Sequence, residues 1–102
     1  MYYALIIFEI GIPGARSLKD KRRVTTSIIT KLKNRFNVAL AEDRENERYE
    51  LSKIYLLTLN TSKNELDSTV YKIENFLENL PDVVLLSFNT DKEIISEEIF
   101  WC

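Results

Sequence analysis

The chain of 102 residues lacks the side chains that most often bind metals or cross-link proteins: it has no histidine and a single cysteine, Cys102. Neither an internal disulfide nor a zinc site of Cys and His ligands can be built from this composition. Glycine and proline are also scarce, with two of each, which leaves little room for disordered linkers. The composition therefore predicts a single folded domain with no metal and no cofactor.

Long hydrophobic runs are absent as well. The apolar run over residues 2–8 is too short to cross a bilayer, and Glu9 follows it directly. The run also lacks the basic leader and the small-residue cleavage site of a signal peptide. We therefore expect a soluble, cytoplasmic protein.

Charge is unevenly distributed along the chain. The formal net charge is −2, yet residues 16–35 carry eight Lys or Arg and one Asp, which is +7 and leaves −9 for the rest. The sequence pI of 5.2 argues against indiscriminate binding of polyanions. It is compatible with one directed basic face.

Hydrophobic periodicity predicts six elements in the order strand, helix, strand, strand, helix, strand. Their expected ranges are 2–12, 18–36, 38–41, 51–59, 63–80 and 83–89. The compact solution for this order is an α+β, ferredoxin-like βαββαβ sandwich, in which a four-stranded antiparallel sheet carries two helices on one face. We expect a single domain over residues 1–102, with a core of 1–90 and a C-terminal extension of 91–102 that forms a strand or an interface.

The segment between the first strand and the first helix has strong local signals. Pro13 and Gly14 predict a type II turn, with positive φ at Gly14. Ser17 is a typical helix N-cap with Asp20 three residues later, and residues 62–65 form a full capping-box pattern at the second helix. The lone strand carboxylate, Glu9, is expected to pair with a lysine from the first helix, Lys21.

Positive charge is concentrated at this first helix start. Cations beside a helix N-terminus are what a phosphate group needs. We therefore predict an anion- or RNA-binding site, with no catalytic residues, at Arg16, Ser17, Lys19, Arg22 and Arg23. The alternative interpretation is a solvated surface whose cations pair with the acids of the second helix.

The segment Ile12–Arg23, with residues 34–38, 41–42 and 81–83, resembles the YlxP-like family of bacterial proteins, also called the domain-of-unknown-function 503 family. The resemblance runs from residue 1 to about residue 90. It implies a ferredoxin-like fold and no established activity. Genes of this family often lie near those for a translation initiation factor and a ribosome-binding factor, which implies ribosome or RNA work by association. The charged stretch 44–50 departs from the family pattern, with Tyr49 in place of a Trp.

Three functions therefore stand as hypotheses. The first is an RNA- or ribosome-associated accessory module, and the second is a structural homo-oligomer, most simply a dimer. The open sheet face in the predicted fold is apolar, so either a second subunit or the tail residues Ile95, Ile99, Phe100 and Trp101 should cover it. The third is a small phosphohydrolase, because acylphosphatases share the fold; it would need Arg16 together with an asparagine, and Asn60 is the first one offered by the middle strand.

Overall fold

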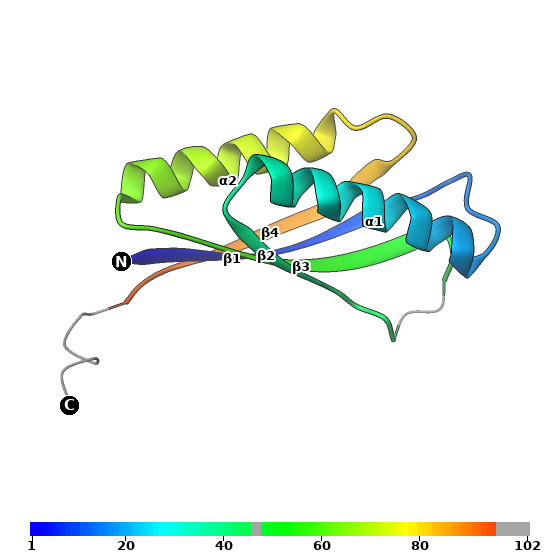
Figure 1. Cartoon of the computed structure of the whole chain (residues 1–102), viewed down its shortest axis with the longest axis horizontal. Coiled ribbons are helices and arrows are strands. Elements are labelled where there is room, and N and C mark those ends of the chain that lie inside the picture. Colours follow the sequence, from blue (N-terminus) through cyan, green and yellow to red (C-terminus); the bar gives the residue numbers. More distant parts are fainter. Residues whose placement is uncertain (46–47, 96–102) are drawn as a thin grey trace.

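The computed structural model describes residues 1–45 and 48–95. The six elements follow in the predicted order (Figure 1). They are β1 (Tyr2–Gly11), α1 (Leu18–Arg35), β2 (Val38–Glu42), β3 (Leu51–Asn60), α2 (Lys63–Glu78) and β4 (Val84–Ile94). The predictions for Ile99, Phe100, Trp101 and Cys102 lie outside the described residues.

The four strands form one antiparallel sheet in the order β2-β3-β1-β4, so β3 and β1 are the central strands. Both helices lie on the same face of this sheet, and the described residues leave the other face uncovered (Figure 1). This arrangement confirms the ferredoxin-like α+β fold.

The core lies between the sheet and the two helices. Alternate residues of β1 and β3 point toward the helices, because successive side chains of a strand face opposite sides of the sheet. Each helix contributes one stripe at helical spacing. The fully buried apolar side chains are Ala4, Ile6, Phe8, Ile10, Leu32, Ile54, Leu56, Leu66, Ile73 and Leu77.

Both predicted helix caps are present. The Ser17 hydroxyl accepts a hydrogen bond from the Asp20 amide at 3.1 Å, and the Ser62 hydroxyl accepts from the Glu65 amide at 3.3 Å. The Asp20 carboxylate also accepts from the Arg16 amide at 3.1 Å. Each cap satisfies an amide that the first helical turn leaves without an intrahelical partner.

Two local predictions were wrong. Ile12 and Ala15 close a turn around Pro13 and Gly14, with a 3.0 Å hydrogen bond between their backbones, but Gly14 has no positive φ. The turn is therefore not type II, and a Cβ at Gly14 would meet open space. The last strand does not end at Asn89 but continues to Ile94, because the backbone of β1 pairs with it along its length.

The expected pairing of Glu9 with Lys21 was also wrong, because the two side chains lie on opposite faces of the sheet. The Glu9 carboxylate lies on the open face and accepts a hydrogen bond from the Ser87 hydroxyl at 3.3 Å. Lys21 is 3% exposed and donates to the backbone carbonyl of Arg48 at 2.9 Å. It thereby ties α1 to the chain just before β3.

Candidate nucleic-acid interface

The candidate interface is the outer side of α1. The buried stripe of this helix is Lys21, Thr25, Ile28 and Leu32, so residues on the opposite side of the helix face solvent. Lys19 lies one turn from both Arg22 and Arg23, which brings these three cations onto one continuous surface. We call Lys19, Arg22 and Arg23 the basic face.

The structure places the predicted site residues at the same end of α1, but in different roles. The side chains of the basic face are exposed, and so is Arg16 in the preceding connection. The Ser17 hydroxyl is occupied by its cap hydrogen bond, and the Asp20 carboxylate lies beside the first turn. The Asp20 amide and the Ser17 hydroxyl are therefore already paired with each other, and the side-chain cations are the groups that we expect an anion to contact.

The cations of the basic face form no ion pair with a carboxylate within the described residues, although Asp20 and Asp82 line the same pocket as Arg23. The ion pairs there are Arg48–Glu50 at 2.9 Å and Lys92–Asp67 at 2.8 Å. Neither pair involves the exposed cations of α1. The expected pairing with acids of α2 is thus not seen in residues 1–45 and 48–95.

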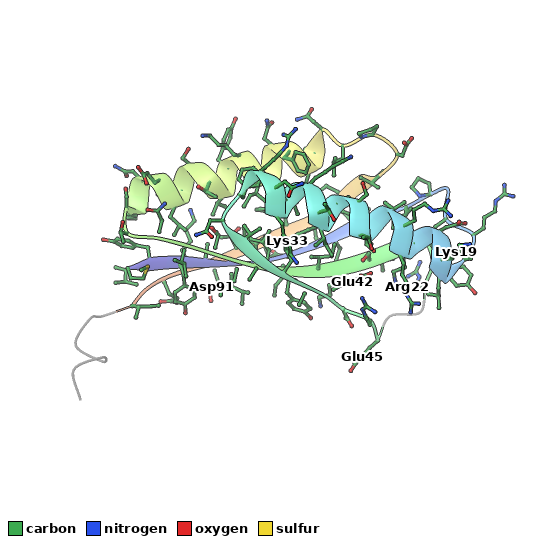
Figure 2. All side chains as sticks on the ribbon, viewed as in Figure 1. Lys19, Arg22, Lys33, Glu42, Glu45 and Asp91 are labelled. Atoms are coloured by element: carbon green, nitrogen blue, oxygen red, sulfur yellow. The ribbon has the colours of Figure 1, made fainter. Side chains whose placement is uncertain are left out.

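Figure 2 shows where charges lie around this helix. Lys19 and Arg22 project at its N-terminal end, and Lys33 lies farther along the same helix (Figure 2). Glu42 and Glu45 belong to the end of β2 and the connection after it, and Asp91 lies on β4 (Figure 2). The positive surface is thus concentrated on one helix, while these labelled acids belong to the sheet and its connections.

A groove between α1 and the end of α2 was not predicted from the sequence. One pocket of about 490 Å³ lies between the C-terminal end of α1 and the last turns of α2. On the α1 side it is lined by Arg35 and by the C-cap residue Phe36. Its other lining residues are Lys72, Asn75, Phe76, Asn79 and Leu80. A second pocket shares Leu80 and continues along α1 past Lys31 to Arg23. The sequence could have indicated this groove only through a comparison of the helical periodicity of α1 with that of α2, about 40 residues later.

The open face of the sheet is apolar at its centre. Leu5, Leu57 and Leu59 are between 36% and 44% exposed, and alternation along the strands puts them on this face. Ala39 of β2 pairs with Leu57 and extends the same surface. On the β4 side, Asp91 lies opposite Leu5 and forms a polar margin.

The pair needed for the phosphohydrolase hypothesis is not brought together. Arg16 follows the C-terminal end of β1, where Gly11 pairs with Leu51. Asn60 pairs with Tyr2 at the other end of the same strand. Nine residue steps of strand, about 30 Å, therefore separate the two ends.

Comparison with known proteins shows which family the chain belongs to. A family model described as "Protein of unknown function (DUF503)" matches residues 4–90. The chain belongs to this family. It is also similar to a protein of Bacillus subtilis (strain 168) named "Uncharacterized protein YlxP", with 25% identity over 75 residues, which cover 74% of this chain and 82% of that protein.

The DUF503 match includes all of α1 and α2, and hence both the basic face and the groove. The last residues of β4, from Asp91 to Ile94, lie beyond it. In the described part of this DUF503 protein, no helix is long and apolar enough to cross a membrane. The same residues contain no cluster of three Cys, Asp or Glu side chains suited to a metal ion.

Proposed function

We propose that this protein is an RNA-associated accessory module that binds phosphate groups through the basic face of α1. The observation that carries the proposal is the exposure of Lys19, Arg22 and Arg23 on one helix surface with no carboxylate partner among residues 1–45 and 48–95. Arg16 extends this surface beyond the helix start.

Phosphate contacts release condensed counterions, and this release supplies most of the affinity of sequence-independent binding. A cation that already has an internal carboxylate partner contributes less, because binding must first break that pair. The negative charge of the remaining chain repels RNA elsewhere and directs it to α1. An acidic protein can therefore bind RNA through one helix.

The test is a salt titration of RNA affinity, measured by fluorescence anisotropy with a labelled single-stranded RNA. Each phosphate contact contributes about 0.7 to the slope of log K against log salt for single strands. Replacing Lys19, Arg22 and Arg23 together with Gln should therefore reduce the slope by about two units. The fold should be retained, because the three side chains are exposed.

The matched control replaces Arg44, Lys53 and Lys63 with Gln, which removes the same charge from outside α1 and breaks neither ion pair. This control variant should retain most of the slope of the wild type. Equal slopes for wild type and basic-face variant, or no RNA binding by the wild type at low salt, would overturn the proposal.

A second candidate function is self-association, and the apolar open face favours it. The strands have 10, 5, 10 and 11 residues. At about 3.3 Å per residue and about 4.8 Å between strands, they give a face of roughly 570 Å². A stable interface buries about 800 Å² on each partner, so this face is close to the size needed. Packing two open faces together would leave both α1 helices on the outside, so a dimer is compatible with RNA binding.

Self-association is tested by light scattering. Leu57→Asp places a charge at the centre of the open face and should convert a dimer to a monomer. Tyr71→Asp is the matched control, because Tyr71 is 70% exposed on α2, away from the sheet. A variant truncated before Ile99 tests the contribution of the tail. A wild-type mass equal to one chain at high protein concentration would reject this function.

A further inference from the structure

The groove between α1 and the end of α2 combines an aromatic ring, a planar cation and side-chain amides. The Arg35 guanidinium lies 4.7 Å from the centroid of the Phe76 ring, and Phe36 meets the same ring edge-on, with centroids 6.5 Å apart. The ring therefore supports Arg35 from beneath, and the exposed guanidinium faces the groove.

Two amide groups line the groove beside this stack. The Asn79 side-chain nitrogen donates to the Asn75 backbone carbonyl at 2.7 Å and to its side-chain oxygen at 3.2 Å. These bonds hold the two amides in place. Within the described residues, the Asn75 amide nitrogen and the Asn79 amide oxygen have no protein partner, so one donor and one acceptor remain available together.

Further cationic side chains line the groove beyond Arg35. Lys72 lines the first pocket, and Lys31 and Arg23 line the second. Asp82 is the carboxylate that lines the second pocket, and the first has none. From Arg23 to Arg35 the helix rises about 18 Å, which is the length of about five stacked nucleotides.

We propose that this groove binds a segment of single-stranded RNA, with one nucleobase stacked on the Arg35 guanidinium. Guanidinium planes and aromatic rings are the surfaces on which unpaired bases stack, and side-chain amides bind their edges. The neighbouring phosphates contact Lys72 and Lys31. The site deepens the proposed function and rests on it, but the groove supplies base contacts that the basic face lacks.

The decisive variant is Arg35→Lys, which keeps the charge and removes the plane. Affinity for a labelled RNA pentamer should fall about fivefold or more, in line with the contribution of one stacked base. Affinity for an abasic pentamer with the same phosphates should not change. Arg44→Lys is the matched control, because it makes the same exchange at an exposed arginine outside both the groove and the basic face, and it should leave both affinities unchanged.

A second measurement separates this site from the basic face. In NMR spectra of the wild type, adenosine 5′-monophosphate should shift the side-chain amide signals of Asn75 and Asn79, while ribose 5-phosphate should not. Equal effects of the two ligands, or pentamer affinities that Arg35→Lys leaves unchanged, would overturn the groove site and leave the basic face standing. A further pair of results would also overturn the groove site and leave the basic face standing. In that case the nucleotide shifts none of these signals, while the basic-face variant still shows a reduced salt slope.

Discussion

Helices α1 and α2 occupy equivalent places in the fold, yet their outer surfaces differ in charge. Each follows a strand, begins after a serine cap and buries four side chains against the same face of the sheet. Outside these stripes, α1 carries six cations and one acid, whereas α2 carries four acids and two lysines. The outer cations of α1 form no ion pair within the described residues, so we expect the charge difference to contribute little to folding. This difference is the basis of the RNA binding proposed for α1.

The buried stripes differ as well. In α2 all four buried side chains are aliphatic, whereas α1 buries Lys21 and Thr25 beside Ile28 and Leu32. The Thr25 hydroxyl donates to the Arg22 carbonyl at 3.3 Å, so this polar group is satisfied within the helix. The helix with the more basic outer surface is thus also the one with the less apolar inner side.

The largest effects on stability should come from substitutions in the buried stripes of the two helices. Leu32→Ala and Leu77→Ala each remove a buried side chain that is at most 1% exposed. Each should lower the free energy of unfolding by about 2–5 kcal/mol, measured by urea denaturation. If only one of them destabilised the domain, the helices would not be structurally equivalent.

The caps should have a smaller effect that is again similar in both helices. Ser17→Ala and Ser62→Ala each remove one hydroxyl that accepts a first-turn amide. Each should cost about 1 kcal/mol, seen as a shifted denaturation midpoint. Ser27→Ala is a suitable control, because Ser27 lies exposed within α1 and caps nothing.

Outer-surface charges should have little effect on stability. Replacing the basic face with Gln, or Glu65, Glu74 and Glu78 with Gln, should change the unfolding free energy by less than about 0.5 kcal/mol per substitution. RNA affinity should respond to the first set only. A large loss of stability in the basic-face variant would show that these cations serve the fold.

The smallest effect concerns one exposed ion pair on the α2 side. The hydrogen bond from Lys92 holds the pKa of Asp67 below its ordinary value. A lowered pKa in the folded state stabilises the fold above the unfolded value, and this contribution is lost as the pH falls through the folded value, below about pH 4. NMR titration should show the Asp67 pKa rising in Lys92→Met, and an unchanged value would mean that the pair is absent in solution.

The elements and caps were predictable because their signals are local. Strand alternation, the helical stripes and the two serines each act within a few residues of sequence. The extension of β4 was not predictable in this way, because Asn89 to Glu93 are polar and the strand is formed by pairing with β1. Backbone pairing there outweighs side-chain preference.

The candidate site was only partly predictable, for a related reason. Charge density along the chain indicates the basic face, since its residues are sequence neighbours on one helix. The groove joins Arg35 to Phe76 and Asn79, which become neighbours only when α1 and α2 pack on the sheet. The position of Lys21 likewise depends on a carbonyl 27 residues away.

The buried lysine has a practical consequence for chemical footprinting. An acylating reagent reacts rapidly with exposed lysines, but it can reach the buried Lys21 amine only when the packing around it, including the hydrogen bond to Arg48, opens. The modification rate of Lys21 therefore measures how often the end of the β2–β3 connection detaches from α1. Exposed lysines such as Lys19 and Lys33 serve as internal references, and protection of these two by RNA would map the contact surface in the same experiment.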